Sequence, residues 1–345
     1  MNFRLILFLV VVMAMASNVK GQDPQFSQYY AAPLYLNPGF TGSTEQQRIV
    51  VNHRIQYPSL PKAFSTSSAS YEFYDSRIRS GFGFLAVRDV VGSAGWNTTY
   101  AGFSYSFKSQ IDRNWVFSPG INFSYGTNGL DKSKLQMRDG LIWDSDGTSY
   151  DPELDHLTNS SFFDLSAGAV LYNQQWWFGV SSHHMTKPNI SLTANESRLP
   201  MKITVHGGVS VPLYNGPKKL DNVHYLTPSV IYRSHGKGSG QLDAGLRYHI
   251  DPVAVGLWYK GIPLGKNDAV GDDAVYMIQR NALVFIAGMK FNGFQFGYSY
   301  DFAVSSSQST TGGAHELSLA YEFAHKNRKR LNRSDKLIPC PSFLL

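Results

Sequence analysis

The sequence is poor in cysteine, in charge and in long apolar runs. Cys340 is the only cysteine among 345 residues, which excludes a framework of disulfides within the chain. Beyond residue 16 no segment reaches the roughly 20 apolar residues of a membrane-spanning helix, so a helical membrane protein is excluded. Charged residues make up only 16% of the chain, which fits poorly with a soluble helical enzyme or a disordered protein.

Aromatic residues and glycine are abundant instead. Phe, Tyr and Trp account for 14% of a chain that also has 31 glycines, a composition typical of an all-β protein that is secreted or lies in an outer membrane. The net charge of +6 arises mainly at the C-terminus, where six of the 31 basic residues fall within 326–345. The basic balance is thus a property of the tail and gives no evidence of a nucleic-acid partner.

Residues 1–21 have the pattern of a secretory signal peptide. Arg4 precedes an apolar stretch from Leu5 to Ala16, and a polar end closes at Gly21. We expect cleavage before Gln22, and therefore an exported mature protein.

Several later segments alternate between large apolar residues and small or polar ones with a period of two. In 115–125, for example, one face carries Phe117, Ile121 and Phe123, and the other face is small or polar. A soluble β-sandwich would also alternate. However, aromatic residues near the strand ends, and strand lengths of about 10–12 residues, favour strands that cross a bilayer at a tilt.

The pattern predicts 14 strands, although weak alternation in three of them leaves counts of 12 or 16 open. The predicted strands are 47–56, 63–74, 81–89, 96–107, 114–125, 162–172, 175–184, 201–213, 223–233, 239–250, 252–260, 280–290, 293–303 and 314–324. The long connections 126–161, 185–200 and 261–279 all follow odd-numbered strands. They should therefore lie at one end of a barrel, as the long external loops of outer-membrane barrels do.

The predicted fold is an all-β, transmembrane antiparallel β-barrel of the outer membrane with about 14 strands, formed by residues 46–324. Closure pairs every backbone N–H and C=O group of the strands within hydrocarbon, which an open sheet cannot do. An even strand count predicts that both termini are periplasmic. Glycines on the inward face would leave room for side chains or for a plug.

No pattern of residues indicates chemistry. The sequence has no Gly-x-Ser-x-Gly or His-Glu-x-x-His motif, and we predict neither catalysis nor a cofactor nor a metal site. His183 and His184 are neighbours on a predicted strand, so they should point to opposite faces and share no metal without a bulge. Residues 144–147 offer oxygens and a turn glycine for Ca²⁺ but lack EF-hand spacing, so we interpret them as a solvated acidic loop.

The mature N-terminus carries two motifs, QDPQFSQYY at 22–30 and LYLNPGFTG at 34–42. Together they resemble the opening of the PorP/SprF family of the type IX secretion system. Further resembling segments are GVSSHHMTKPN at 179–189, LTPSVIYR at 226–233, GAHELSLAYEF at 313–323 and CPSF at 340–343. The resemblance implies an outer-membrane barrel that helps to export and hold secreted proteins, often gliding adhesins. It implies cargo C-terminal domains and periplasmic components of the machinery as partners.

The two ends of the mature chain are candidate docking elements. Prolines at 24, 33 and 38 predict that 22–45 is an extended segment with turns, which either plugs the periplasmic mouth of the barrel or docks a periplasmic partner. The basic tail 325–345 is interpreted as solvated and periplasmic, or as a contact for an acidic partner. In the long loops, Trp143 and Tyr150 are candidate anchors for a secreted partner, because aromatic residues dominate interface hot spots. The full set of predicted partner-binding residues is Asp23, Pro24, Gln25, Phe26, Leu36, Asn37, Pro38, Trp143, Tyr150, Arg328, Lys329 and Arg330.

The resulting hypothesis is a scaffold in the outer membrane that contacts lipid, secreted cargo and periplasmic machinery. The alternative is a diffusion porin or small-molecule channel, whose lumen would be lined by charge. The charges on the predicted inward faces are few, and they are Asp243, Arg247, Asp301, Glu316 and Glu322.

Overall fold

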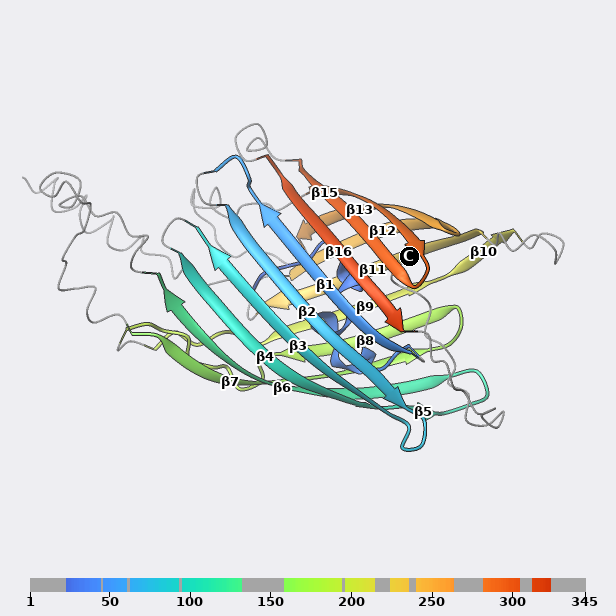
Figure 1. Ribbon diagram of the computed structural model, residues 1–345, viewed down its shortest axis with the longest axis horizontal. Helices are drawn as coiled ribbons and strands as arrows, with labels where there is room; N and C mark the ends of the chain where they lie inside the picture. Colours follow the sequence, from blue (N-terminus) through green and yellow to red (C-terminus); the bar gives the residue numbers. More distant parts are fainter. Residues whose placement is uncertain are drawn as a thin grey trace, which may run out of the picture.

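A computed structural model of the chain describes residues 23–44, 46–60, 63–92, 95–131, 158–193, 196–214, 224–235, 240–263, 282–304 and 312–323. Most of these residues form antiparallel strands that wrap around a short helical segment (Figure 1). The strands are β1 (Gln47–Gln56), β2 (Phe64–Asp75), β3 (Ser80–Val91), β4 (Trp96–Phe107), β5 (Ser109–Gln110), β6 (Val116–Leu130), β7 (Ser160–Tyr172), β8 (Trp176–His183), β9 (Lys202–Val209), β10 (Val211–Tyr214), β11 (His224–His235), β12 (Gly240–Ile250), β13 (Val253–Pro263), β14 (Ala282–Phe291), β15 (Phe294–Ala303) and β16 (Ala314–Phe323).

The strands close into a barrel through β1, which pairs with β2 on one side and with β16 on the other. The ladder to β16 runs the whole length of β1, from Gln47 opposite Phe323 to Gln56 opposite Ala314. Of the 16 strands, β5 lies off the main path, and β10 continues β9 along the same neighbour, β11. Fourteen strand positions therefore close the barrel, which confirms the predicted fold class and count.

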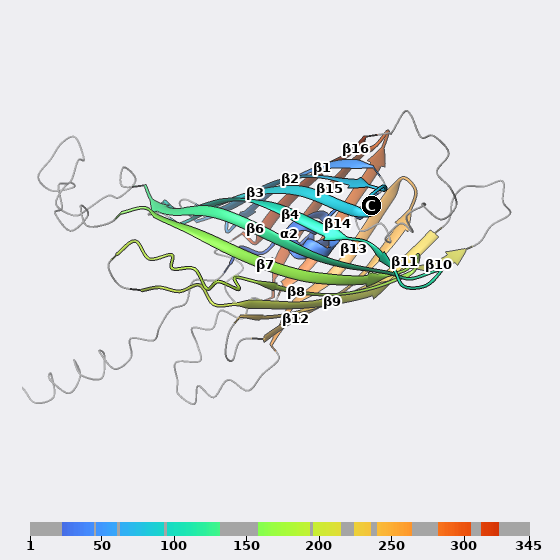
Figure 2. The ribbon, with the colours of Figure 1, turned by 90° about the horizontal axis from the view of Figure 1, so that it is seen from below.

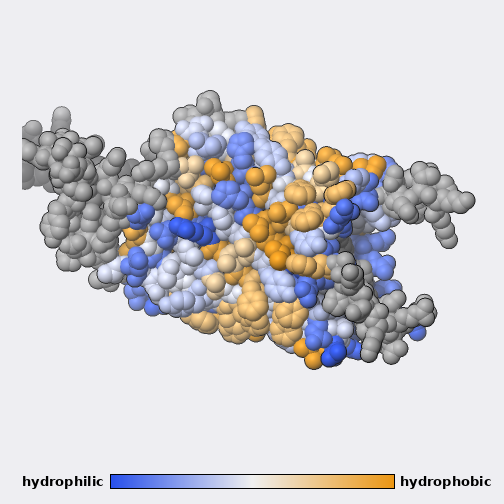
Figure 3. Space-filling model, in the orientation of Figure 1, coloured by the Kyte–Doolittle hydropathy of each residue, from blue (hydrophilic) through white to orange (hydrophobic). Residues whose placement is uncertain are grey.

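Side chains alternate between the lumen and the outer surface. On β1, Asn52 and Arg54 are buried, whereas Ile49 and Val51 are exposed. The exposed large apolar side chains recur around the barrel, for example Phe123 on β6 and Phe285 on β14. On the face shown in Figure 3, hydrophobic side chains spread over the middle of the strands and hydrophilic ones lie toward the ends. Among the residues that the structure describes, no helix is long and apolar enough to cross a membrane.

The connections at the two ends of the barrel differ in length. The long ones are 131–159, 184–201 and 264–281, and they leave from the same end, which we call the long-connection end. The hairpins β2–β3, β7–β8 and β14–β15 turn tightly at the opposite end, which we call the short-turn end. β1 begins and β16 ends at the short-turn end.

Residues 23–44, which we call the plug, lie inside the barrel (Figure 2). They contain η1 (Tyr29–Ala31), α2 (Pro33–Leu36) and η2 (Pro38–Phe40). The sequence predicted an extended segment with turns; the structure adds short helical turns, because proline is well tolerated in the first turn of a helix. Phe40 is 0% exposed, and the plug supplies much of the apolar core that fills the lumen.

Candidate functional site

The plug runs along the lumen from one end of the barrel to the other, rather than across a single mouth. Asp23 contacts His184 and Lys202, which flank the long connection between β8 and β9. Gly42, in contrast, donates its backbone N–H to Glu72, near the tight β2–β3 turn at the short-turn end. Asp23 and Phe323 therefore lie at opposite ends of the barrel. The prediction that both termini are periplasmic concerns end residues that lie outside the described ranges.

Glycines in the wall let the plug come close to the strands. A Cβ added to Gly81 would lie 2.2 Å from the carbonyl oxygen of Thr41, and one added to Gly120 would lie 2.4 Å from that of Pro38. Both distances are far below van der Waals contact, so these two positions require glycine while the plug is in place. The prediction that inward glycines make room for a plug is consistent with this geometry.

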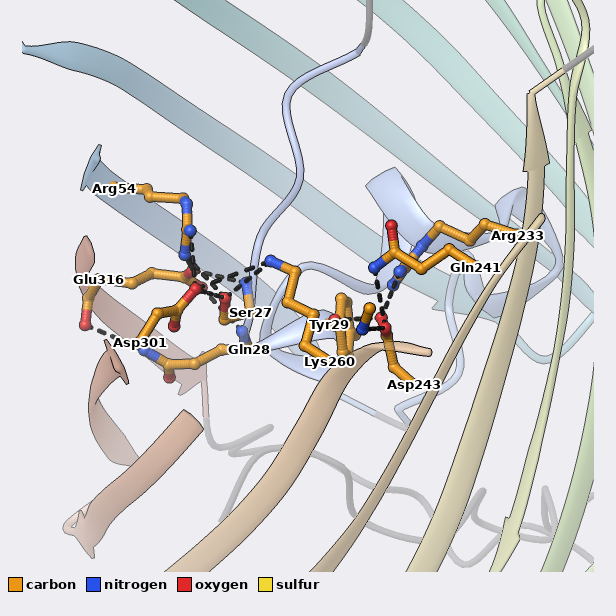
Figure 4. A network of polar contacts seen from close by, with 11 residues as sticks. Ser27, Gln28, Tyr29, Arg54, Arg233, Gln241, Asp243, Lys260, Asp301 and Glu316 are labelled. Carbon is orange, nitrogen blue, oxygen red and sulfur yellow. Dashed lines mark hydrogen bonds and ion pairs between the residues drawn. The ribbon is translucent and has the colours of Figure 1, made fainter. Parts of the chain in front are cut away.

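A cluster of buried charges holds the first part of the plug (Figure 4). Glu316 accepts hydrogen bonds from the backbone N–H groups of Ser27 (2.7 Å) and Gln28 (3.0 Å). Arg54 donates to Ser27 Oγ (2.7 Å) and to Asp301 Oδ2 (2.7 Å), and it also pairs with Glu316 at 3.2 Å. The three charged side chains come from β1, β15 and β16, so the plug is bonded across the seam that closes the barrel.

A second charged group surrounds Tyr29, the next residue of the plug. The Tyr29 hydroxyl donates to Asp243, which also accepts from Arg233 at 2.5 Å and from Gln241 at 2.8 Å. The Arg233 guanidinium lies 4.1 Å from the centre of the Tyr29 ring, a cation–π contact. Figure 4 shows this group beside the Glu316 cluster, with Lys260 between the two.

The Asn-Pro-Gly turn of the plug is fixed by its asparagine. Asn37 is 0% exposed, and its Oδ1 accepts from the backbone N–H of Gly39 at 2.8 Å. Its Nδ2 donates to the carbonyl oxygens of Ala169 (3.2 Å) and Val180 (3.1 Å) on the wall. A buried amide whose two ends are both bonded stabilises one orientation of the turn.

At the long-connection end, Asp23 joins the plug to the connection between β8 and β9. Its carboxylate bonds to Lys202 Nζ at 2.7 Å and to His184 Nε2 at 2.8 Å, while His184 Nδ1 contacts Asp164 at 2.8 Å. Burial by itself raises the pKa of Asp23, but the positive charges of Lys202 and His184 outweigh this and hold the pKa well below its ordinary value. Burial lowers the pKa of His184, but the two carboxylates outweigh this effect and raise the pKa to about 9.

The structure corrects the expectation that His183 and His184 point to opposite faces. β8 ends at His183, and His184 has a positive φ of 59°, so the chain leaves the strand and both imidazoles line one cavity. Each imidazole is bonded within the protein, His183 to the carbonyl of Leu36 (3.2 Å) and His184 to two carboxylates. Within the described ranges no cluster of three or more metal-ligating side chains occurs. Residues 144–147 lie outside those ranges.

The predicted partner-binding residues fall into two groups. The first group lies in the plug, inside the barrel. Phe26, Leu36, Asn37 and Pro38 are buried, and Asp23, Pro24 and Gln25 are partly buried. The others, Trp143, Tyr150, Arg328, Lys329 and Arg330, lie outside the described residues. A role of any of them in partner binding stays a prediction.

Sequence reasoning missed several buried charged residues that contact the plug. Arg48 and Arg54 on β1, Glu72 on β2 and Lys260 on β13 all face the lumen. On β1 the alternation of faces was a usable signal, because Arg48 and Arg54 lie on the face opposite to that of Ile49 and Val51. Their partners could not be read from that pattern.

Several solved structures match the chain over most of its length, at about 10% sequence identity or less. The Ralstonia pickettii toluene transporter TbuX matches at 9% identity, with a TM-score of 0.48, over 85% of this chain and 93% of that one. The P. putida toluene transporter TodX matches at 9% identity and a TM-score of 0.46, over 84% of this chain and 93% of that one. BamA from Haemophilus ducreyi lacking POTRA domains 1–3 matches at 10% identity and a TM-score of 0.41, over 81% of this chain and 71% of that one.

A search among curated proteins finds no match. A family model does match, over residues 18–321, and its description is type IX secretion system membrane protein PorP/SprF. That span includes the plug and nearly the whole barrel, and it confirms the family that the N-terminal motifs indicated. The chain therefore belongs to the PorP/SprF family of type IX secretion system membrane proteins.

Proposed function

We propose that this outer-membrane barrel of the type IX secretion system supports the export and cell-surface attachment of secreted proteins, as a scaffold without catalysis. In this proposal the cargo is surface adhesins used in gliding motility, presented through their C-terminal domains. After removal of the signal peptide 1–21, the long-connection end would face outward and the short-turn end would face the periplasm, as in other outer-membrane barrels.

The plug is the observation that carries the proposal. It bonds to strands around the whole circumference, including β1, β4, β6, β8, β12 and β16. Its aromatic side chains pack against wall residues such as Trp177 and Trp258. A lumen filled in this way favours a barrel that presents its rims to partners over one that passes solutes.

In this proposal the two rims have different partners. The long-connection end, with Trp143 and Tyr150 in its longest connection, would receive or hold the cargo, because loop tips placed by rigid strands commonly carry function. The short-turn end, with the basic tail 325–345, would dock to periplasmic components of the secretion and gliding machinery.

A diffusion porin is the second candidate, and the charged residues of the lumen are the observation that favours it. Arg54, Lys260, Asp301 and Glu316 would suit the charged lining of a channel. They are, however, buried and bonded to one another and to the plug, rather than arranged around open water.

The proposal is tested by comparing the surface and secreted proteins of a parent strain with those of a clean deletion. We expect the deletion strain to lose one or a few large surface proteins while other exported proteins stay unchanged. Loss of all exported cargo would make the chain a core component of the machine. An unchanged set of exported proteins, together with slower uptake of solutes, would contradict the proposal and favour the porin.

A further inference from the structure

A cavity of about 320 Å³ lies between the plug and the long-connection end. Pro24, Leu34 and Tyr35 of the plug form one side, and β3, β4, β6 and β7 supply the wall. Ile190 and Leu199 of the connection between β8 and β9 line it as well. This connection is held against the wall, since Asn128 of β6 donates to the carbonyl of Ile190 at 2.6 Å. The volume lies at the lower end of the range for small-ligand pockets, roughly 300–1,000 Å³.

The charges that line the cavity do not balance. Asp23 and Asp164 are paired with Lys202 and His184, as described above. A third carboxylate, Asp89 on β3, accepts a hydrogen bond from Thr66 Oγ1 at 2.6 Å and has no cationic partner in the described part of the chain. The described lining thus has one negative charge more than it has positive charges.

The uncharged part of the lining combines aliphatic, polar and aromatic residues. Tyr35, Trp96, Tyr100 and Phe162 all border the cavity that Asp89 borders. Aromatic rings around a cation stabilise it through their negative faces, and a carboxylate adds a direct ionic contact. An apolar cavity with one unpaired carboxylate therefore favours a ligand that has one positive charge on an apolar stem.

We propose that this cavity binds an alkylammonium or guanidinium group, with the charge beside Asp89 and the stem against the aromatic residues. A lysine or arginine side chain of a polypeptide is one source of that chemistry, and a free organic ammonium ion is another. The inference goes beyond the proposed function and does not depend on it, because binding is measured on the purified chain alone.

Calorimetric titration of the purified mature protein in detergent micelles tests the inference. The probes are N-acetyl-lysine methylamide, the uncharged analogue N-acetyl-norleucine methylamide, which lacks the ammonium group, and tetramethylammonium. We expect saturable binding of the lysine probe, none of the norleucine probe, and an affinity reduced about tenfold or more in Asp89→Asn. Tetramethylammonium that binds as well as the lysine probe assigns the site to a free organic ammonium, and its failure to bind assigns it to a peptide side chain.

The matched control is Asp112→Asn, which removes a carboxylate from an exposed turn at the other end of the barrel. Asparagine at 89 still accepts the hydrogen bond from Thr66, and heat-modifiable migration on gels verifies that the variant barrel is folded. The inference is overturned if the wild type binds no cationic probe, if the norleucine probe binds equally well, or if Asp89→Asn binds like the wild type.

A second measurement does not depend on probe affinity. Ser166 is buried on β7 and borders the cavity. In a Cys340→Ser background, a cysteine introduced by Ser166→Cys should react faster with a cationic methanethiosulfonate than with a neutral one, and Asp89→Asn should abolish the preference. Equal rates for the two reagents in the presence of Asp89 would contradict the inference.

Discussion

At the scale of single residues, wall glycines set how closely the plug approaches the strands. We expect Gly120→Ala to destabilise the protein by on the order of 1–3 kcal/mol, as overpacking of a filled interior does. The new methyl group would lie 2.4 Å from the carbonyl oxygen of Pro38, a backbone atom that cannot rotate away. The shift in the urea midpoint of unfolding in detergent micelles measures the effect.

Gly256→Ala is the matched control for this change. Gly256 also lies within a barrel strand, but a Cβ there would meet Ile286 Cβ at 3.5 Å, an ordinary contact. We expect the free energy of unfolding of the Gly256→Ala variant to stay within about 0.5 kcal/mol of the wild-type value. Equal effects of the two substitutions would mean that contact with the plug is not what requires glycine at position 120.

At the scale of elements, Asp23 and His184 join the plug to the connection between β8 and β9, and this junction should depend on pH. The pKa of His184 is raised from 6.5 to about 9, so its contribution is complete below pH 6.5 and is lost as the pH rises through 9. The pKa of Asp23 is lowered, so its contribution is complete above pH 3.8 and is lost only in stronger acid. The junction should therefore loosen above pH 9.

A nitroxide at position 25, attached through Gln25→Cys in a Cys340→Ser background, reports this motion. Its spectrum should show a growing mobile component between pH 8 and pH 10, because the neutral imidazole no longer attracts Asp23 and Asp164. His184→Gln removes the titrating group, and in that variant the spectrum should not change over this interval. A pH-dependent component of the same size in His184→Gln would assign the change to Lys202 or to another group.

The strands could be predicted from the sequence, whereas the plug contacts could not. β1 and β4 have the predicted bounds because the face of each strand residue is set by parity, a local property. The hydrogen bond from Ser27 to Glu316 joins residues 289 positions apart, and no local pattern specifies such a pair. His184 shows the limit of parity itself, since the rule for neighbouring residues fails where the chain leaves the strand at positive φ.

At the scale of the whole molecule, closure of the barrel and filling of the lumen are separate features. The seam between β1 and β16 consists of backbone pairing along all of β1, and the plug takes no part in that ladder. Without the plug, the lumen would expose small polar side chains, such as Ser68 and Ser118, and the charges around Glu316, together with apolar wall residues such as Trp177 and Trp258. Water can solvate the polar and charged groups, and the exposed apolar residues leave the backbone ladder intact, so the strands should still close around an open, wet lumen.

We therefore expect deletion of 23–42 to convert a closed barrel into a conducting one. In planar bilayers the intact protein should show no steady conductance, and the deletion variant should show a large and stable one. The exposed-turn variant Asp112→Asn controls for preparation and should stay closed, and heat-modifiable migration should confirm that both variants have assembled. Steady conductance of the intact protein would mean that the plug does not close the lumen and would favour the porin. A deletion variant that fails to assemble would show instead that the barrel needs the plug to close, and that the bonds to Arg54, Asp301 and Glu316 help to form the seam as well as to fill the lumen.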